Sequence, residues 1–195
     1  MALYKASRNQ IEPGDLLLFR NSASAIADES RTPYSHAGVA AWYGDVLLCA
    51  ESRELRGGRI VTLSSQVRRY PKRIDVFRPQ VSYPIRKKAA ELAIKQAGHE
   101  YNYWGLFACC LLHLPILRRI LRYFPDTTDV ALTAWESPKF CSQLACWCYR
   151  LAAKGQMGFW DPVPDLGDRF CEPGHLALSG SFRRVLTQLE HGAAA

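Results

Sequence analysis

The sequence predicts an α+β fold in which an antiparallel sheet packs against helices. Short apolar runs bounded by turn residues occupy the chain up to about residue 80 and are typical of strands, whereas helical periodicity dominates after that point. The chain has 195 residues, of which 48% are hydrophobic and 22% are charged, and this is enough for one substantial core. We therefore expect a single domain over residues 1–195.

Five segments before residue 80 have the short apolar pattern of strands: "GDLLLFR" (14–20), "HAGVAAWY" (36–43), "VLLCAE" (46–51), "GGRIVTLSS" (57–65) and "RIDVFRP" (73–79). The first follows a Pro-Gly turn signal, and the small, polar residues 21–33 after it are expected to form a loop or a lid. The second and third flank Gly44 and Asp45, a two-residue turn typical of a β-hairpin.

Three helices are expected after the strands. The first, in residues 83–97, has Pro84 near its start and Gly98 as a stop, which are common helix boundary signals. One of its faces is predicted to be buried and consists of Ile85, Ala89, Leu92, Ala93 and Gln96. The second, in residues 104–124, is expected to kink at Pro115. Its uncharged stretch of about 14 residues is shorter than the roughly 20 that span a bilayer.

The third helix is predicted from "SPKFCSQLACWCYRLAAKG", with Ser137 as its cap, Pro138 at its first position and Gly155 at its end. An apolar stripe along it is formed by Phe140, Leu144, Trp147 and Leu151. The Pro- and Gly-rich tail from residue 156 is expected to be irregular, apart from a last strand at "SFRRVL" (181–186).

The predicted hairpin places an imidazole beside a carboxylate. If Gly44 and Asp45 are the two turn residues, Glu51 lies opposite Gly38, and His36 lies on the same face, diagonal to Glu51. Their backbones are then within roughly 7 Å of each other. A carboxylate at this distance can hold the imidazole in one tautomer and one orientation. A register slip of one residue would place the two side chains on opposite faces.

A histidine oriented by an acid needs a nucleophile to form a catalytic device, and Cys141 is the best candidate. It lies near the start of the third helix, where free N–H groups and the helix dipole favour thiolate over thiol. The alternative is that Cys141 is a small core residue, as buried cysteines usually are. The remaining six cysteines do not have this placement: Cys49, Cys109, Cys110, Cys146, Cys148 and Cys171.

The cysteines also bear on compartment and metal binding. Their odd number and their place inside apolar runs indicate synthesis in a reducing compartment, and the start of the chain shows no apolar signal-peptide segment. We therefore expect cytoplasmic synthesis, with export by a specialised route or peripheral membrane association as alternatives. No C-x-x-C pair occurs, and Cys146 and Cys148 would point to nearly opposite sides of a helix. We expect no metal site and no cofactor.

The chain carries a net charge of +7, with basic clusters at 67–73, 117–122 and 182–184. Such clusters suit anionic partners, although solvated basic faces are the more common explanation. We expect a peptide or lipid substrate, an anionic membrane surface as a further candidate partner, and no nucleic acid. The sequence predicts no oligomeric state.

Five motifs in this order resemble the circularly permuted, NlpC-like branch of papain-fold thiol hydrolases: "GDLLLFR", "YSHAGVA", "LLCAES" with "GGRIVTLSS", "YNYWGLF" and "KFCSQLACWCYRLA". YiiX/YebB-like proteins are the nearest members, and lecithin:retinol acyltransferase-like enzymes are more distant relatives. In ordinary papain-like chains the cysteine helix precedes the histidine strand, whereas here His36 comes before Cys141, as in the permuted branch. The resemblance covers roughly residues 12–155.

The resemblance implies Cys141 as nucleophile, His36 as general base and Glu51 as the residue that orients the imidazole. It also implies an acyl-enzyme mechanism with oxyanion donors near the helix start, for which Tyr34 and Gln143 are weaker candidates than the Cys141 backbone N–H. The family usually has an acidic residue after F-C-S, where this chain has Gln143. We interpret this as a change near the site that leaves the triad intact.

Three functions remain open. The leading hypothesis is an amide hydrolase that cleaves peptides such as those of the bacterial cell wall, because this is the commonest chemistry of the NlpC-like relatives. The first alternative is a lipid acyl hydrolase or acyltransferase, and the second is an inactive binding module. Residues 104–124 bear on the choice, because apolar residues combined with Arg118, Arg119 and Arg122 suit an interfacial helix. Core packing with snorkelling arginines is the competing interpretation.

Overall fold

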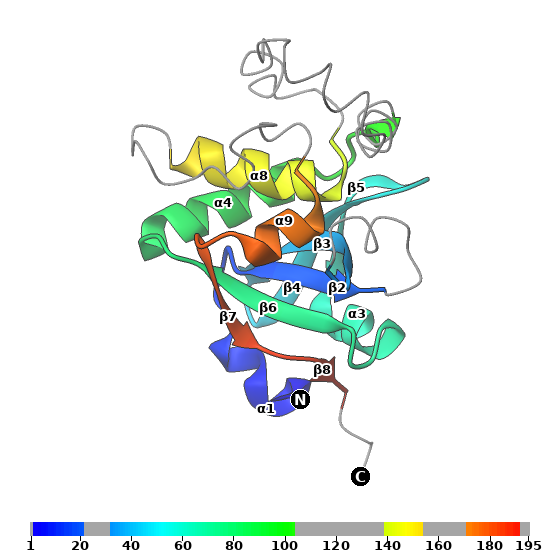
Figure 1. The fold of residues 1–195 in the computed structure, drawn as a ribbon, viewed down its shortest axis with the longest axis vertical. Helices are drawn as coiled ribbons and strands as arrows, with labels where there is room; N and C mark the ends of the chain where they lie inside the picture. Colours follow the sequence, from blue (N-terminus) through cyan, green and yellow to red (C-terminus); the bar gives the residue numbers. More distant parts are fainter. Residues whose placement is uncertain (1, 22–31, 104–138, 154–170, 192–195) are drawn as a thin grey trace.

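The computed structural model describes residues 2–21, 32–103, 139–153 and 171–191. At its centre is a six-stranded sheet with the order β5-β4-β3-β2-β6-β7, in which every neighbouring pair is antiparallel (Figure 1). Its strands are β2 (Leu16–Arg20), β3 (Tyr34–Tyr43), β4 (Val46–Arg53), β5 (Gly57–Thr62), β6 (Ile74–Pro79) and β7 (Phe182–Leu186). The predicted α+β class and antiparallel sheet are confirmed.

Helices and a short strand pair cover the two faces of this sheet (Figure 1). The helices are α1 (Tyr4–Ser7), the 3-10 turn η1 (Arg8–Gln10), α3 (Leu63–Arg69), α4 (Tyr83–Lys95), α8 (Cys141–Ala152) and α9 (Pro173–Leu178). A separate parallel pair joins β1 (Ala2–Leu3) to β8 (Leu189–Glu190). One hydrophobic core lies between the sheet and α4, α8 and α9, and a second lies on the opposite face, under α1, α3 and β8.

The hairpin of β3 and β4 has the predicted register. Gly44 adopts a positive φ in the turn, Tyr43 pairs with Val46, and Gly38 pairs with Glu51. The strand begins two residues earlier than predicted, at Tyr34, and its pairing with β2 shifts near Arg20. The loop or lid expected at 21–33 lies mostly outside the described residues.

Helix α4 agrees with the prediction in both its limits and its buried face. Pro84 lies in its first turn, and the helix stops shortly before Gly98, which has a positive φ. The predicted face is buried, including Gln96 just past the end of the helix. Ala89 and Ala93 are small enough for α4 to lie close to α8 and β3 in the first core.

Helix α8 differs from the prediction at its start and in its surroundings. It begins at Cys141 with Phe140 as the N-cap, so Lys139 and Phe140 precede the helix. Every residue from Cys141 to Tyr149 is buried, which replaces the predicted single apolar stripe. A helix enclosed on all sides has no polar face from which periodicity can be read. Ser137, Pro138 and Gly155 lie outside the described residues, as does the helix expected at 104–124.

Among the described residues, the sequence analysis missed the helices α1, α3 and α9 and the turn η1. Two of these, α3 and α9, lie where another structure was expected. The segment predicted as a strand at 57–65 ends at Thr62, whose hydroxyl accepts from the Ser65 N–H and caps α3. In the tail expected to be irregular, α9 forms at Pro173–Leu178. Both helices are short, and their apolar residues are too few to show a helical period. The last predicted strand is confirmed as β7.

Gly57 and Gly58 allow the end of α4 to touch the edge strand β5. The N–H of Gly58 donates to the His99 carbonyl over 2.7 Å, and the N–H of Gly98 donates to the Gly58 carbonyl over 2.7 Å. A Cβ on Gly58 would overlap the carbonyl oxygen of Gln96. The two glycines therefore allow β5 to lie in close contact with the residues that follow α4.

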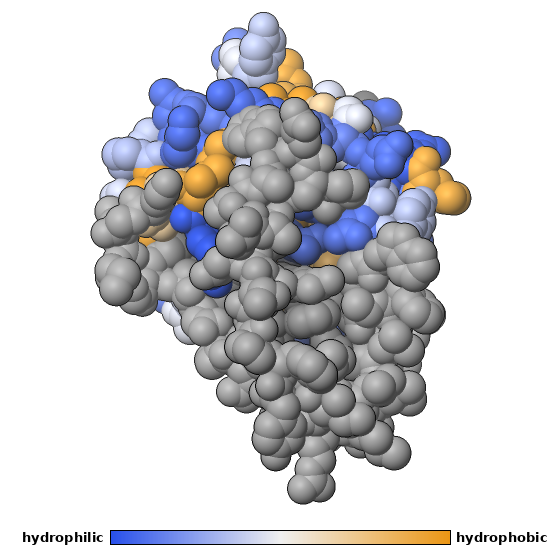
Figure 2. Space-filling view, turned by 90° about the horizontal axis from the view of Figure 1, so that it is seen from above, coloured by the Kyte–Doolittle hydropathy of each residue, from blue (hydrophilic) through white to orange (hydrophobic). Residues whose placement is uncertain are grey.

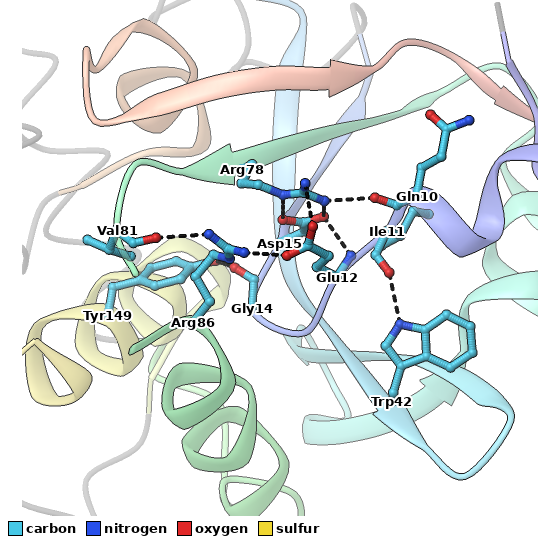
Figure 3. Close-up of polar contacts among 10 residues, drawn as sticks. All are labelled: Gln10, Ile11, Glu12, Gly14, Asp15, Trp42, Arg78, Val81, Arg86 and Tyr149. Atoms are coloured by element: carbon cyan, nitrogen blue, oxygen red, sulfur yellow. Dashed lines mark hydrogen bonds and ion pairs between the residues drawn. The ribbon is translucent and has the colours of Figure 1, made fainter. Parts of the chain in front are cut away.

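A polar cluster ties the start of β2 to α4, β6 and α8 (Figure 3). The buried carboxylate of Asp15 accepts from Nε and Nη2 of Arg78 over 2.9 and 2.8 Å. Glu12 pairs with Arg78 over 2.7 Å and with Arg86 of α4. Tyr149, in the C-terminal half of α8, donates its hydroxyl to the Gly14 carbonyl over 2.7 Å. The C-terminal half of α8 is thereby fixed against the sheet.

Replacing Gly58 by Ala is expected to destabilise the protein by about 1–3 kcal/mol, as overpacking of a tight contact usually does. The new methyl group must displace the Gln96 carbonyl and with it the end of α4. Gly180→Ala is the matched control, because nothing lies within 4 Å of a Cβ at that position. Urea unfolding followed by circular dichroism measures both variants. Equal midpoints for G58A and the wild type would contradict the close-contact interpretation.

Candidate active site

The hairpin brings His36 and Glu51 into direct contact. Nε2 of His36 lies 2.6 Å from Oε2 of Glu51. The Glu51 side chain has no exposed surface, and that of His36 is 15% exposed. A short contact between a ring nitrogen and a buried carboxylate fixes both the tautomer and the orientation of the imidazole. The sequence prediction that these two side chains lie together is confirmed.

Gly38 makes room for this contact. It pairs directly with Glu51, and a Cβ at this position would lie 2.7 Å from Sγ of Cys49 and 3.5 Å from Cβ of Glu51. Because Gly38 has no side chain, the space above it on this face of the sheet is occupied by the side chains of Cys49, His36 and Glu51. Its φ is not in the left-handed region, so the constraint is close approach and not backbone conformation.

Phe19 supports the imidazole ring. The Phe19 and His36 rings meet edge to face, with centroids 5.0 Å apart, and the two residues pair across β2 and β3. Phe19 in turn makes an edge contact with Tyr70 at 5.7 Å. Such contacts limit the rotation of the histidine ring about its χ angles. The ring is held by a carboxylate through one of its nitrogens and by an aromatic ring alongside.

Cys141 is the first residue of α8 and meets His36 there. The two side chains are close enough that each shifts the pKa of the other, and the backbone of Ala37 and Ser142 also lowers the pKa of the Cys141 thiol. Nε2 of His36 is engaged with Glu51, which leaves Nδ1 as the ring nitrogen available to Cys141. The structure therefore brings together Cys141, His36 and Glu51 in one chain of contacts.

These contacts shift the pKa values of all three groups. Burial raises the pKa of the Cys141 thiol, but the charge and hydrogen bond of His36 outweigh it, so that the pKa is lowered. Burial lowers the pKa of His36, but Cys141 and Glu51 together raise it to about 9. Burial raises the pKa of Glu51, but His36 and Arg59 lower it to about 2. The three shifts all favour a thiolate beside an imidazolium and a carboxylate.

Two hydroxyl groups anchor the start of α8. Ser52, one residue after Glu51 on β4, donates to the carbonyl of Lys139 over 2.5 Å. Ser142 donates to the carbonyl of Cys171 over 2.7 Å. Both serine side chains are buried. The residues on either side of Cys141 are thus tied to the strand that carries Glu51 and to the segment before α9.

Tyr34 and Gln143, the weaker candidates for oxyanion donors, are both engaged elsewhere. The hydroxyl of Tyr34 donates to Oδ2 of Asp75 over 2.5 Å. Oε1 of Gln143 accepts from the Phe140 N–H over 3.4 Å and from the Asn102 amide over 3.1 Å. Tyr34 thus ties the start of β3 to β6, and Gln143 caps the first turn of α8.

Other described cysteines lack the environment of Cys141. Burial raises the pKa of Cys49, and the nearby Glu51 raises it further. Burial likewise raises the pKa of Cys148. Cys49, Cys146, Cys148 and Cys171 are buried free thiols, whereas Cys109 and Cys110 lie outside the described residues. Among the described cysteines whose pKa is shifted, Cys141 is the one whose pKa is lowered, and His36 is the main cause.

Arg59 is the residue of this site that the sequence analysis missed. It pairs directly with Glu51 across β4 and β5, and its Nε donates to Oε1 of Glu51 over 2.8 Å, with Nη2 donating to the same oxygen. Counting outward from the turn at 54–56, as for the first hairpin, would have placed the two residues opposite each other. The sequence analysis treated this stretch as a strand and not as the partner of a catalytic acid.

Neither a metal site nor a membrane span is found in the described part of the chain. No group of three or more His, Cys, Asp or Glu side chains there is arranged to hold a metal ion. Its helices are all too short or too polar to cross a membrane.

Comparisons with known proteins agree with this geometry. Residues 10–105 match the model of the permuted papain-like amidase enzyme, YaeF/YiiX, C92 family. The match includes His36 and Glu51 and ends before Cys141. No curated protein matched the chain.

Among solved structures, the metalloprotein yiiX from Escherichia coli O157:H7 has the same fold, with a TM-score of 0.57 at 14% identity, over 92% of this chain and 99% of that chain. At this identity the likeness concerns the fold alone. The fold, the order of the motifs and the match over residues 10–105 agree with one another, and by them this chain resembles the permuted papain-like cysteine hydrolases.

Proposed function

We propose that this protein is a thiol hydrolase that cleaves amide bonds through an acyl-enzyme on Cys141. The family description indicates a cysteine hydrolase of the amidase type. The observation that carries the proposal is the chain of contacts from Cys141 at the start of α8, through His36, to the buried Glu51. A nucleophile, a base and a group that orients the base are the three parts that such catalysis requires.

In the first half of the reaction, the Cys141 thiolate attacks the carbonyl carbon of the substrate. The C–N bond breaks as the His36 imidazolium gives its proton to the departing nitrogen. An amine leaves, and the acyl group remains on Sγ as a thioester. The negative oxygen that forms on the way can accept from the backbone N–H of Cys141, since first-turn N–H groups have no partner within their helix.

In the second half, neutral His36 takes a proton from water, and the oxygen of that water attacks the thioester carbonyl. The C–S bond breaks, the acid leaves, and the thiolate and imidazolium are restored. Glu51 stays ionised and keeps Nδ1 of His36 directed at the reacting atoms in both halves. No step of this proposal uses a metal. The structural neighbour yiiX is described as a metalloprotein, and that description applies to yiiX alone.

Peptides, including those of bacterial cell wall, are the substrates we propose first, because the matching family is described as amidases. A lipid acyl hydrolase or acyltransferase is the alternative, and its main sequence support lies in residues 104–124, outside the described residues. On the face in Figure 2, the described residues are mostly hydrophilic, with the hydrophobic ones in small groups. An inactive binding module is the least favoured alternative, because the three groups lie in contact.

The test of this function is to incubate the protein with peptidoglycan fragments and, separately, with phospholipid vesicles, and to identify products by mass spectrometry. Cys141→Ser is the control, because it removes the thiolate and keeps a residue of similar size. New amine and acid ends from the fragments, lost in the variant, support the proposal. Fatty acid release from vesicles would favour the lipid alternative, and no product from either would favour the binding module.

Iodoacetamide near pH 7 is expected to alkylate Cys141 ahead of the other six cysteines. Its lowered pKa supplies the thiolate that reacts, whereas burial suppresses ionisation at Cys49 and Cys148. Peptide mapping of the folded protein after brief labelling measures the order of reaction. First labelling of another cysteine, with Cys141 left intact, contradicts the assignment of the nucleophile.

Replacing His36 by Ala should move the pH dependence of Cys141 alkylation upward, towards the ordinary thiol midpoint of roughly 8.5. In the wild type the imidazolium, whose pKa is raised to about 9, lowers the pKa of the Cys141 thiol. Glu51→Gln should give an intermediate midpoint and a loss of turnover of at least about tenfold, because the imidazolium loses its carboxylate. Circular dichroism checks that both variants fold. An unchanged midpoint in H36A would contradict the ion pair.

A further inference from the structure

We propose that Arg59 is a positioning residue that holds Glu51 in its catalytic orientation and charge state, and thereby sets the lower pH limit of the site. This inference rests on the proposed function, since it concerns the same triad. The observations that carry it are the two contacts of the Arg59 side chain with one oxygen of Glu51 and the complete burial of that carboxylate.

The two oxygens of Glu51 have separate partners. Oε2 accepts from His36 over 2.6 Å, whereas Oε1 accepts from Nε and Nη2 of Arg59. A rotation of the carboxylate about its last torsion would break both sets of contacts. Arg59 therefore fixes the plane of the carboxylate, and through Oε2 it fixes the direction of the imidazole. The 15% exposure of the Arg59 side chain shows that this contact is itself largely shielded from water.

Arg59 also supplies a charge that His36 cannot supply throughout the reaction. The imidazole is positive before it protonates the leaving group and neutral afterwards, so its attraction for Glu51 disappears in the middle of each cycle. A buried carboxylate without a cation takes up a proton more readily. The guanidinium of an arginine is a permanent positive charge in proteins. It keeps Glu51 ionised while His36 is neutral.

Other charged and titratable groups around the pair do not replace Arg59. Arg53, on β4, reaches Oε1 of Glu51 only at 3.7 Å, and its Nη2 donates to the hydroxyl of Tyr70. Cys49 lies beside Glu51 with its pKa raised by burial, so it stays neutral. Cys141 acts on His36 from the other side. Among these groups, Arg59 is the cation that hydrogen-bonds to Glu51 in both states of His36.

The consequence is a defined shift in pH dependence. Without Arg59, burial raises the pKa of Glu51, so the carboxylate takes up a proton at a higher pH than in the wild type. Protonated Glu51 no longer stabilises the imidazolium, and the Cys141 thiolate is lost with it. On the acid side, the rate of Cys141 alkylation falls as the thiolate is lost, and we call this part of the pH profile the acid limb. Without Arg59 the acid limb must move to higher pH.

The experiment compares iodoacetamide alkylation of Cys141 between pH 4 and 9 in the wild type, Arg59→Met, Arg59→Lys and Arg53→Met. R59M should shift the acid limb upward by about one pH unit or more, as loss of a charge partner within 4–6 Å does. R59K keeps the charge with a single hydrogen bond and should lie between R59M and the wild type. R53M is the matched control, and its limb should stay close to that of the wild type. Circular dichroism shows which variants fold.

The decisive arm adds R59M to Glu51→Gln. With no carboxylate to titrate, R59M should cause no further shift in the E51Q background. A shift of equal size in both backgrounds, or a folded R59M with the limb of the wild type, overturns the role of Arg59. If R59M does not fold, the test rests on R59K. An acid limb at higher pH in R59K than in the wild type supports the role of Arg59, and an acid limb at the same pH overturns it. Selective labelling of wild-type Cys141 in the same series shows whether the proposed function itself stands.

Discussion

The buried carboxylate of Glu51 is the constraint around which the site is arranged. A charge without exposed surface is costly unless each of its oxygens is paired, and here the partners come from the strands on either side. His36 on β3 and Arg59 on β5 can both reach it only because the three strands keep one register, in which Gly38 and Arg59 lie opposite Glu51. The sheet and the site thus depend on each other.

Cys141 belongs to another layer of the structure, and several contacts hold it against this sheet. Tyr149 joins the C-terminal half of α8 to the start of β2, while Ser52 holds the chain just before the helix against the end of β4. Because Ser52 follows Glu51 directly, one strand end positions both Glu51 and the start of α8. The residues of α8 from Cys141 to Tyr149 are all buried, so the helix is held on every side along this length.

The chain order has a related consequence. The family match at residues 10–105 contains His36, Glu51 and Arg59, the part of the site that is built within one sheet. Cys141 lies beyond this match and reaches the site through the packing of α8, which lies mainly against α4 and β3. A permuted order changes neither the contacts nor the chemistry, because the thiol, imidazole and carboxylate have to meet in space and not in sequence.

The sequence by itself determined what depends on neighbouring residues. The turn at Gly44 and Asp45 fixes the register of β3 and β4, and register alone places His36 beside Glu51. Contacts between distant segments were decided by the tertiary structure. The sequence placed Cys141 near the start of its helix but set that start too early, at Ser137 and Pro138, whereas α8 begins at Cys141 itself. Tyr34 proved to donate to Asp75, far away in the chain. The pairing of Arg59 with Glu51 across a second hairpin could have been counted from the sequence, but its importance comes from the burial of Glu51, which no local pattern encodes.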